Sequence, residues 1–88
     1  MHNIQNVISD TICYLESNDQ IKLECVLYWG NNGWDKILFY LNNNPETRLE
    51  VEVSIDEENE SVVATVLEST TFTHSEIEKI MNTFTSMF

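Results

Sequence analysis

Histidine is the side chain best suited to acid-base catalysis near neutral pH, and this chain of 88 residues has two. His74 lies in the segment 73–76, where a threonine and a glutamate have the spacing of a helix capping box. His2 stands at the second position, and apart from Ser75 within the same capping segment the sequence places no serine or cysteine nucleophile beside either histidine. We therefore expect two surface histidines, no catalytic residue and a protein that is not an enzyme.

A run of acidic residues at positions 56–60 resembles the start of a calcium-binding loop. An EF-hand loop has glycine at its sixth position and glutamate at its twelfth, where this chain has Ser61 and Leu67. The sequence also lacks a glycine-rich phosphate loop and paired-cysteine zinc spacing. We expect a solvated turn here, with no metal and no cofactor.

Cys13 and Cys25 fall within segments of regular hydrophobic period. Residues 1–10 have neither the basic region nor the apolar region of a secretory signal, and the longest apolar run, 37–41, is too short to span a bilayer. We therefore expect a cytoplasmic protein with two buried, reduced structural thiols. A disulfide or a redox role for the pair is the alternative.

The chain is strongly acidic, with fifteen Asp and Glu against four Lys and Arg and a net charge of -11. Most of these carboxylates can have no cationic partner within the chain. Repulsion between these carboxylates and other negative charges disfavours direct binding to nucleic acid or to an anionic membrane. The charge instead favours a basic protein as the partner.

Hydrophobic period predicts the elements. Apolar residues recur at helical spacing over 4–15, and they alternate at strand spacing over 21–29. Gly30, Asn31, Asn32 and Gly33 suit a hairpin turn. The next segment, 34–41, is expected to be a strand because of the preceding turn and its aromatic content, although Trp34, Ile37, Leu38 and Leu41 also fit a helical stripe.

The second half predicts another hairpin and a helix. Residues 42–47, which contain Pro45, are expected to form a loop before strands at 49–55 and 61–67, and a helix follows the cap at Thr73. We expect one α+β domain over 1–88, a two-layer sandwich in which both helices cover one face of a four-stranded antiparallel sheet. A helix at 34–41 would change the order to α-β-α-β-β-α. The predicted core is Ile4, Val7, Ile8, Leu15, Leu23, Leu27, Phe39, Val51, Val53, Ile77, Ile80 and Phe84.

Two surfaces are candidates for binding a partner. Glu50 and Glu52 share the outward face of a predicted strand, about 6.6 Å apart, which is comparable to the spacing of phosphates along DNA. Such a row fits the phosphate-binding surface of a nucleic-acid-binding protein. The alternative is that the negative charge only keeps the protein soluble. The residues that extend the row are Glu24, Asp56, Glu57, Glu58 and Glu60.

The second surface is apolar. If 34–41 is a strand, its outward residues lie beside those of the preceding strand and leave an uncovered patch, which suits an interface or a homodimer. The two tryptophans would then be anchors, although core packing is the alternative for them. The patch comprises Val26, Tyr28, Trp29, Trp34, Leu38 and Tyr40.

In size, acidity and small α/β build, the chain resembles phage-encoded DNA mimics such as uracil-DNA glycosylase inhibitor and some anti-restriction and anti-CRISPR proteins. No motif matches residue by residue, so no site residue is carried over. The resemblance implies an inhibitor that blocks the basic groove of its target. Two alternatives are an immunity protein against a nuclease toxin and, with a helix at 34–41, a dimeric chaperone similar in the layout of 34–88 to acidic type III secretion chaperones.

Overall fold

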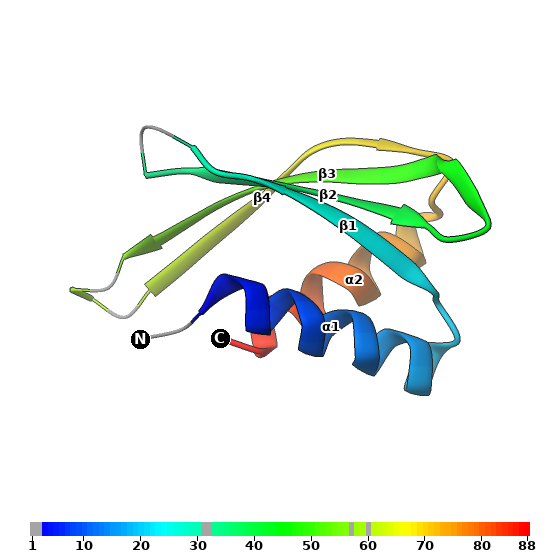
Figure 1. Ribbon diagram of the computed structural model, residues 1–88, viewed down its shortest axis with the longest axis horizontal. Helices are drawn as coiled ribbons and strands as arrows, with labels where there is room; N and C mark the ends of the chain where they lie inside the picture. Colours follow the sequence, from blue (N-terminus) through cyan, green and yellow to red (C-terminus); the bar gives the residue numbers. More distant parts are fainter. Residues whose placement is uncertain (1–2, 31–32, 57, 60) are drawn as a thin grey trace.

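The computed structural model describes residues 3–30, 33–56, 58–59 and 61–88. Two helices lie on the same side of an antiparallel sheet of four strands in the order β1-β2-β3-β4 (Figure 1). This confirms the predicted α+β fold. The elements are α1 (Ile4–Asp19), β1 (Leu23–Tyr28), β2 (Asp35–Leu41), β3 (Asn44–Asp56), β4 (Ser61–Thr70) and α2 (His74–Ser86).

The segment 34–41 decides the topology. Within it, β2 pairs along its length with both β1 and β3, so its backbone groups complete the ladders on each side. Ile37 and Phe39 point into the core and are fully buried. The alternative helix and the order α-β-α-β-β-α are therefore wrong, and the likeness to secretion chaperones, which depended on that helix, loses its basis.

Local signals set the limits of α1. The Asn3 side chain accepts a hydrogen bond from the backbone N–H of Gln5 at 2.9 Å, which caps the first turn. The helix continues past Leu15 to Asp19 and ends where Gln20 adopts a left-handed conformation, with φ of 57°. It is thus one turn longer than the hydrophobic stripe predicted.

The predicted capping box of α2 is confirmed. The backbone N–H of Glu76 donates to the Thr73 hydroxyl at 3.1 Å, and the backbone N–H of Thr73 donates to the Glu76 carboxylate at 2.9 Å. These bonds satisfy donors that have no partner within the helix.

The predicted loop at 42–47 is wrong. Leu41 pairs with Asn44, so only residues 42–43 form the turn and β3 begins directly after them. Pro45 is tolerated because it lies next to the strand's first residue, where a missing N–H removes little of the ladder. In β4 the pairing also runs past Leu67 to Thr70, after a register shift opposite Glu50 and Val51.

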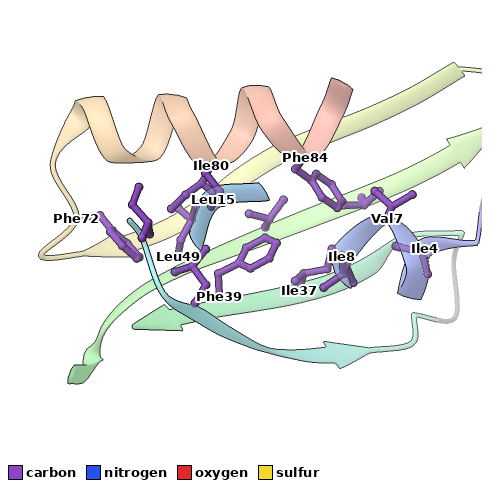
Figure 2. Close-up of a cluster of buried hydrophobic side chains, with 14 residues drawn as sticks. Ile4, Val7, Ile8, Leu15, Ile37, Phe39, Leu49, Phe72, Ile80 and Phe84 are labelled. Atoms are coloured by element: carbon purple, nitrogen blue, oxygen red, sulfur yellow. The ribbon is translucent and has the colours of Figure 1, made fainter. Parts of the chain in front are cut away.

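The core lies between the sheet and the helices (Figure 2). Phe84 of α2 is fully buried, and its ring meets Phe39 of β2 edge-on at a centroid distance of 6.0 Å and Phe88 at 5.1 Å. Most of the predicted core is buried, but Leu27 and Ile77 are only half-buried and pack against the core from outside it. The core also includes Ile21, Ile37, Leu49 and Phe72.

Neither described helix combines the length and the apolar character that crossing a lipid bilayer requires.

Candidate binding site

The face of the sheet opposite the helices, here called the outer face, carries the predicted partner-binding residues of the strands. Val51 and Val53 point into the core, so Glu50 and Glu52 point to the opposite side of β3. The pairing register then places the outward residues of β1 and β2 beside them. The outer face of these three strands includes Glu24, Val26, Tyr28, Lys36, Leu38, Tyr40, Arg48, Glu50 and Glu52.

The predicted apolar residues of β1 and β2 lie on this face. Val26 is paired with Leu38, and Tyr28 follows on the same side of β1. The flanking tryptophans are not core residues, since Trp29 is 65% exposed and Trp34 37% exposed. Core packing, the alternative for the two tryptophans, is therefore wrong. Both lie at the end of the β1–β2 hairpin, just outside the two strands.

Four residues of the patch line a shallow hollow of about 330 Å³, here called the aromatic hollow. Its lining combines three aromatic side chains with charged side chains of β2 and β3. Its lining residues are Tyr28, Trp29, Gly30, Trp34, Lys36, Leu38, Glu50 and Glu52.

A close backbone contact holds the hairpin at this hollow. The backbone N–H of Gly30 donates to the Asp35 carboxylate at 3.0 Å. A Cβ atom added to Gly30 would overlap the backbone carbonyl of Trp34. Glycine is therefore required for the two strands to come this close, and no local pattern in the sequence shows this. Asn31 and Asn32, part of the predicted turn, lie outside the described residues.

The carboxylates of the outer face do not form an unbroken row. Lys36 lies opposite Glu52, and its ammonium group is 3.9 Å from the Glu50 carboxylate. Glu24 shares the face but lies opposite Tyr40, which in turn lies opposite Arg48. The structure thus brings Glu50 and Glu52 together and keeps Glu24 apart from them.

The acidic turn after β3 contains a structural carboxylate. The Asp56 carboxylate accepts hydrogen bonds from the Asn59 side chain at 2.7 Å and from the backbone N–H groups of Asn59 and Glu58 at 3.3 and 3.1 Å. These bonds, first of all the one from the Asn59 side chain, lower the pKa of Asp56 below its ordinary value of 3.8. Glu58 is exposed, whereas the predicted residues Glu57 and Glu60 lie outside the described residues.

The Asn59→Ala substitution is expected to raise the pKa of Asp56 toward 3.8, because it removes the strongest of these bonds. A lowered folded-state pKa means that ionised Asp56 stabilises the fold above pH 3.8, and that this contribution is lost as the pH falls through the lowered value. NMR titration of the side-chain carboxyl carbon measures the shift. Asn43→Ala, in the other described hairpin turn, is the matched control, and an equal change in both variants would contradict the assignment.

The structure adds charged residues that we did not predict at this site. Lys36 shares its face with Leu38 and Tyr40, as strand alternation already implied, but its closeness to Glu50 depends on the register. Glu68 is placed opposite Glu50 only by the irregularity in β4, for which the sequence carries no signal. On the other layer, α1 carries Asp10, Glu16 and Asp19 and no Lys or Arg.

The cysteines differ from expectation. Cys13 is exposed, because it lies on α1 away from the buried stripe, so its prediction as a buried thiol is wrong. Cys25 is half-buried, and this burial raises the pKa of its thiol. Both thiols are free, which rules out a disulfide between them in this structure.

The histidines and the possibility of a metal site are the other candidates for chemistry. His74 is a surface residue, as predicted, with its ring 3.8 Å from the Glu78 carboxylate one turn later, and His2 lies outside the described residues. Within the described part of the chain, no three His, Cys, Asp or Glu side chains are grouped so that they could hold a metal ion.

Comparisons of the chain with models of protein families, with characterised proteins and with solved structures found no match.

Proposed function

We propose that this protein is a non-enzymatic inhibitor that uses its outer face to block the basic, nucleic-acid-binding surface of a target protein. The observation that carries the proposal is the juxtaposition of Glu50 and Glu52 with the exposed aromatic side chains of the β1–β2 hairpin. Carboxylates attract a basic groove over long distances, and aromatic side chains supply the desolvated contacts that hold a complex together. We place its action in the cytoplasm, where the exposed Cys13 thiol would stay reduced.

Charge explains how such a protein would find its target. A net charge of -11 repels polynucleotides but accelerates encounter with a cationic groove, and this acceleration falls with ionic strength. Once bound, the protein would exclude nucleic acid both by occupying the groove and by neutralising its charge. The mixed charges of the outer face also imply selectivity, since Lys36 and Arg48 would repel a groove that is basic at those positions.

The test starts with capture on the immobilised protein from a lysate of the organism that encodes it, elution with increasing salt and identification by mass spectrometry. We expect a basic nucleic-acid-binding protein that elutes with salt. The isolated partner should then lose its binding to labelled DNA or RNA when equimolar protein is added. A partner that binds nucleic acid and this protein at once, or a complex indifferent to salt, would rule out the proposal.

Paired charge variants locate the surface. Glu50→Gln with Glu52→Gln removes two charges from the outer face, whereas Asp10→Asn with Glu16→Gln removes two from α1 on the helical side. Both change the net charge from -11 to -9. We expect only the first pair to weaken partner binding substantially. Equal effects of the two pairs would mean that the charge acts through the protein as a whole.

A further inference from the structure

The aromatic hollow presents three large rings to solvent at one end of the sheet. Tyr28 is 52% exposed, more than Val26 on the same strand, and Trp29 is the most exposed of the large apolar side chains described. The faces of tyrosine and tryptophan rings carry negative potential, so they attract cations as well as apolar groups. The rings are therefore suited to a ligand that is both flat and positively charged.

The charged side chains that line the hollow are mostly negative, which suits a positively charged ligand. Two carboxylates, Glu50 and Glu52, lie on its β3 side, and the only lysine that lines it is Lys36. Lys36 is within ion-pair distance of Glu50, whereas Glu52 makes no ion pair with any described residue. One carboxylate that lines the hollow thus remains available to a cation from outside.

We propose that the aromatic hollow binds an arginine side chain of the basic partner. The guanidinium stacks on an exposed ring while its N–H groups donate a forked pair of hydrogen bonds to the Glu52 carboxylate. Lysine fits less well, because its compact, strongly hydrated ammonium group neither stacks on a ring nor donates a parallel pair of hydrogen bonds to one carboxylate. A volume of about 330 Å³ is at the lower end for ligand pockets, which suits a single side chain.

Lys36 modulates this site. Its ammonium group is 3.9 Å from Glu50 and therefore repels an incoming guanidinium and competes with it for the carboxylates. Replacing Lys36 with methionine keeps an unbranched apolar stem but removes the charge. The variant should bind arginine more tightly than the native protein does.

A second copy of this chain is the main rival occupant. The sequence has a single arginine, Arg48, which lies on the same face as the hollow. Two chains of net charge -11 repel each other, which favours a basic partner over a second copy. This inference rests on the proposed function, because that function supplies the basic partner.

Tryptophan fluorescence reports on the hollow directly, because both tryptophans of the sequence line it. The probes are three blocked peptides of Gly and Ser that carry three arginines, three lysines or three citrullines, the last being a neutral analogue of arginine. We expect saturable binding of the arginine peptide and about three- to thirtyfold weaker binding of the lysine peptide. The citrulline peptide should not bind.

Variants test the assignment of residues. Glu50→Gln with Glu52→Gln should weaken arginine binding, as should Trp29→Leu with Trp34 as the remaining reporter, whereas Lys36→Met should tighten it. Asp10→Asn with Glu16→Gln is the matched control and should leave the affinity unchanged. Circular dichroism confirms that each variant is folded.

Several results would overturn the inference: no saturable binding, equal binding of the arginine and citrulline peptides, or equal loss in the control pair. A dimer in sedimentation experiments that dissociates in the Arg48→Gln variant would assign the hollow to a second copy instead. The peptide assay is independent of the capture experiment. Arginine binding without inhibition of a nucleic-acid-binding protein refutes only the proposed function, and inhibition without arginine binding refutes only this inference.

Discussion

The Phe84→Ala substitution is expected to destabilise the protein by about 3–5 kcal/mol. Phe84 is fully buried, and its ring contacts both Phe39 of β2 and Phe88 near the end of the chain. Alanine leaves a cavity at the junction of α2 and the sheet that neighbouring side chains can fill only in part. Small domains have a total stability of about 5–15 kcal/mol, so the expected loss is a large share of it.

Urea unfolding followed by circular dichroism measures the effect of Phe84→Ala. If this variant does not fold, Phe84→Leu keeps much of the side-chain volume and should give a smaller, measurable loss. The matched control is Phe88→Ala, which removes one ring contact at a half-buried position and should cost about 1 kcal/mol. Equal losses for Phe84→Ala and Phe88→Ala would contradict the packing seen in the structure.

The Gly30→Ala substitution is expected to cost about 1–3 kcal/mol and to change the aromatic hollow. The added methyl group overlaps the backbone carbonyl of Trp34, and backbone cannot move aside as a flexible side chain does. The hairpin must shift, which strains the 3.0 Å hydrogen bond between the Gly30 N–H and the Asp35 carboxylate. Thermal unfolding measures the stability, and the emission maximum of Trp29 and Trp34 reports the rearrangement.

Gly33→Asn is the control for Gly30→Ala. Gly33 has a φ of +79°, which asparagine tolerates better than most residues, and a Cβ atom there meets nothing within 4 Å. The control should therefore cost less stability than Gly30→Ala, through backbone strain alone, and should leave the emission nearly unchanged. An unchanged melting temperature and emission maximum in Gly30→Ala would show that the two strands are not in close contact at this point.

Much of the fold was predictable because its signals are local. Strict alternation at Leu49, Val51 and Val53 identified β3, and the spacing of Thr73 and Glu76 identified the cap of α2. The turn chemistry before Trp34 correctly favoured a strand over a helix. Pro45 misled the prediction, because the residue type alone does not show whether its missing N–H faces a partner.

The candidate site was predictable only in part. Alternation predicted that Glu50 and Glu52 share one face of their strand and that Val26, Tyr28, Leu38 and Tyr40 share another surface, and the register of the strands joins the two surfaces into one. Alternation could not show that Lys36 lies 3.9 Å from Glu50, because that distance depends on the register between two strands. The prediction for Cys13 was wrong because a position within a helix is buried only on the apolar stripe, and Cys13 lies off the stripe of α1.

By itself, the sequence determined most of the elements, with 34–41 favoured as a strand, the buried face of these strands and helices, and the excess of negative charge. These properties follow from the overall composition and from the period of apolar residues, which can be read from residues that are neighbours in the sequence. Only the tertiary structure decided which charges meet on the outer face, that Lys36 lies among its carboxylates, and that a glycine shapes the aromatic hollow. Register, bulges and close backbone contacts bring together residues from different strands, so no single segment of the sequence encodes them.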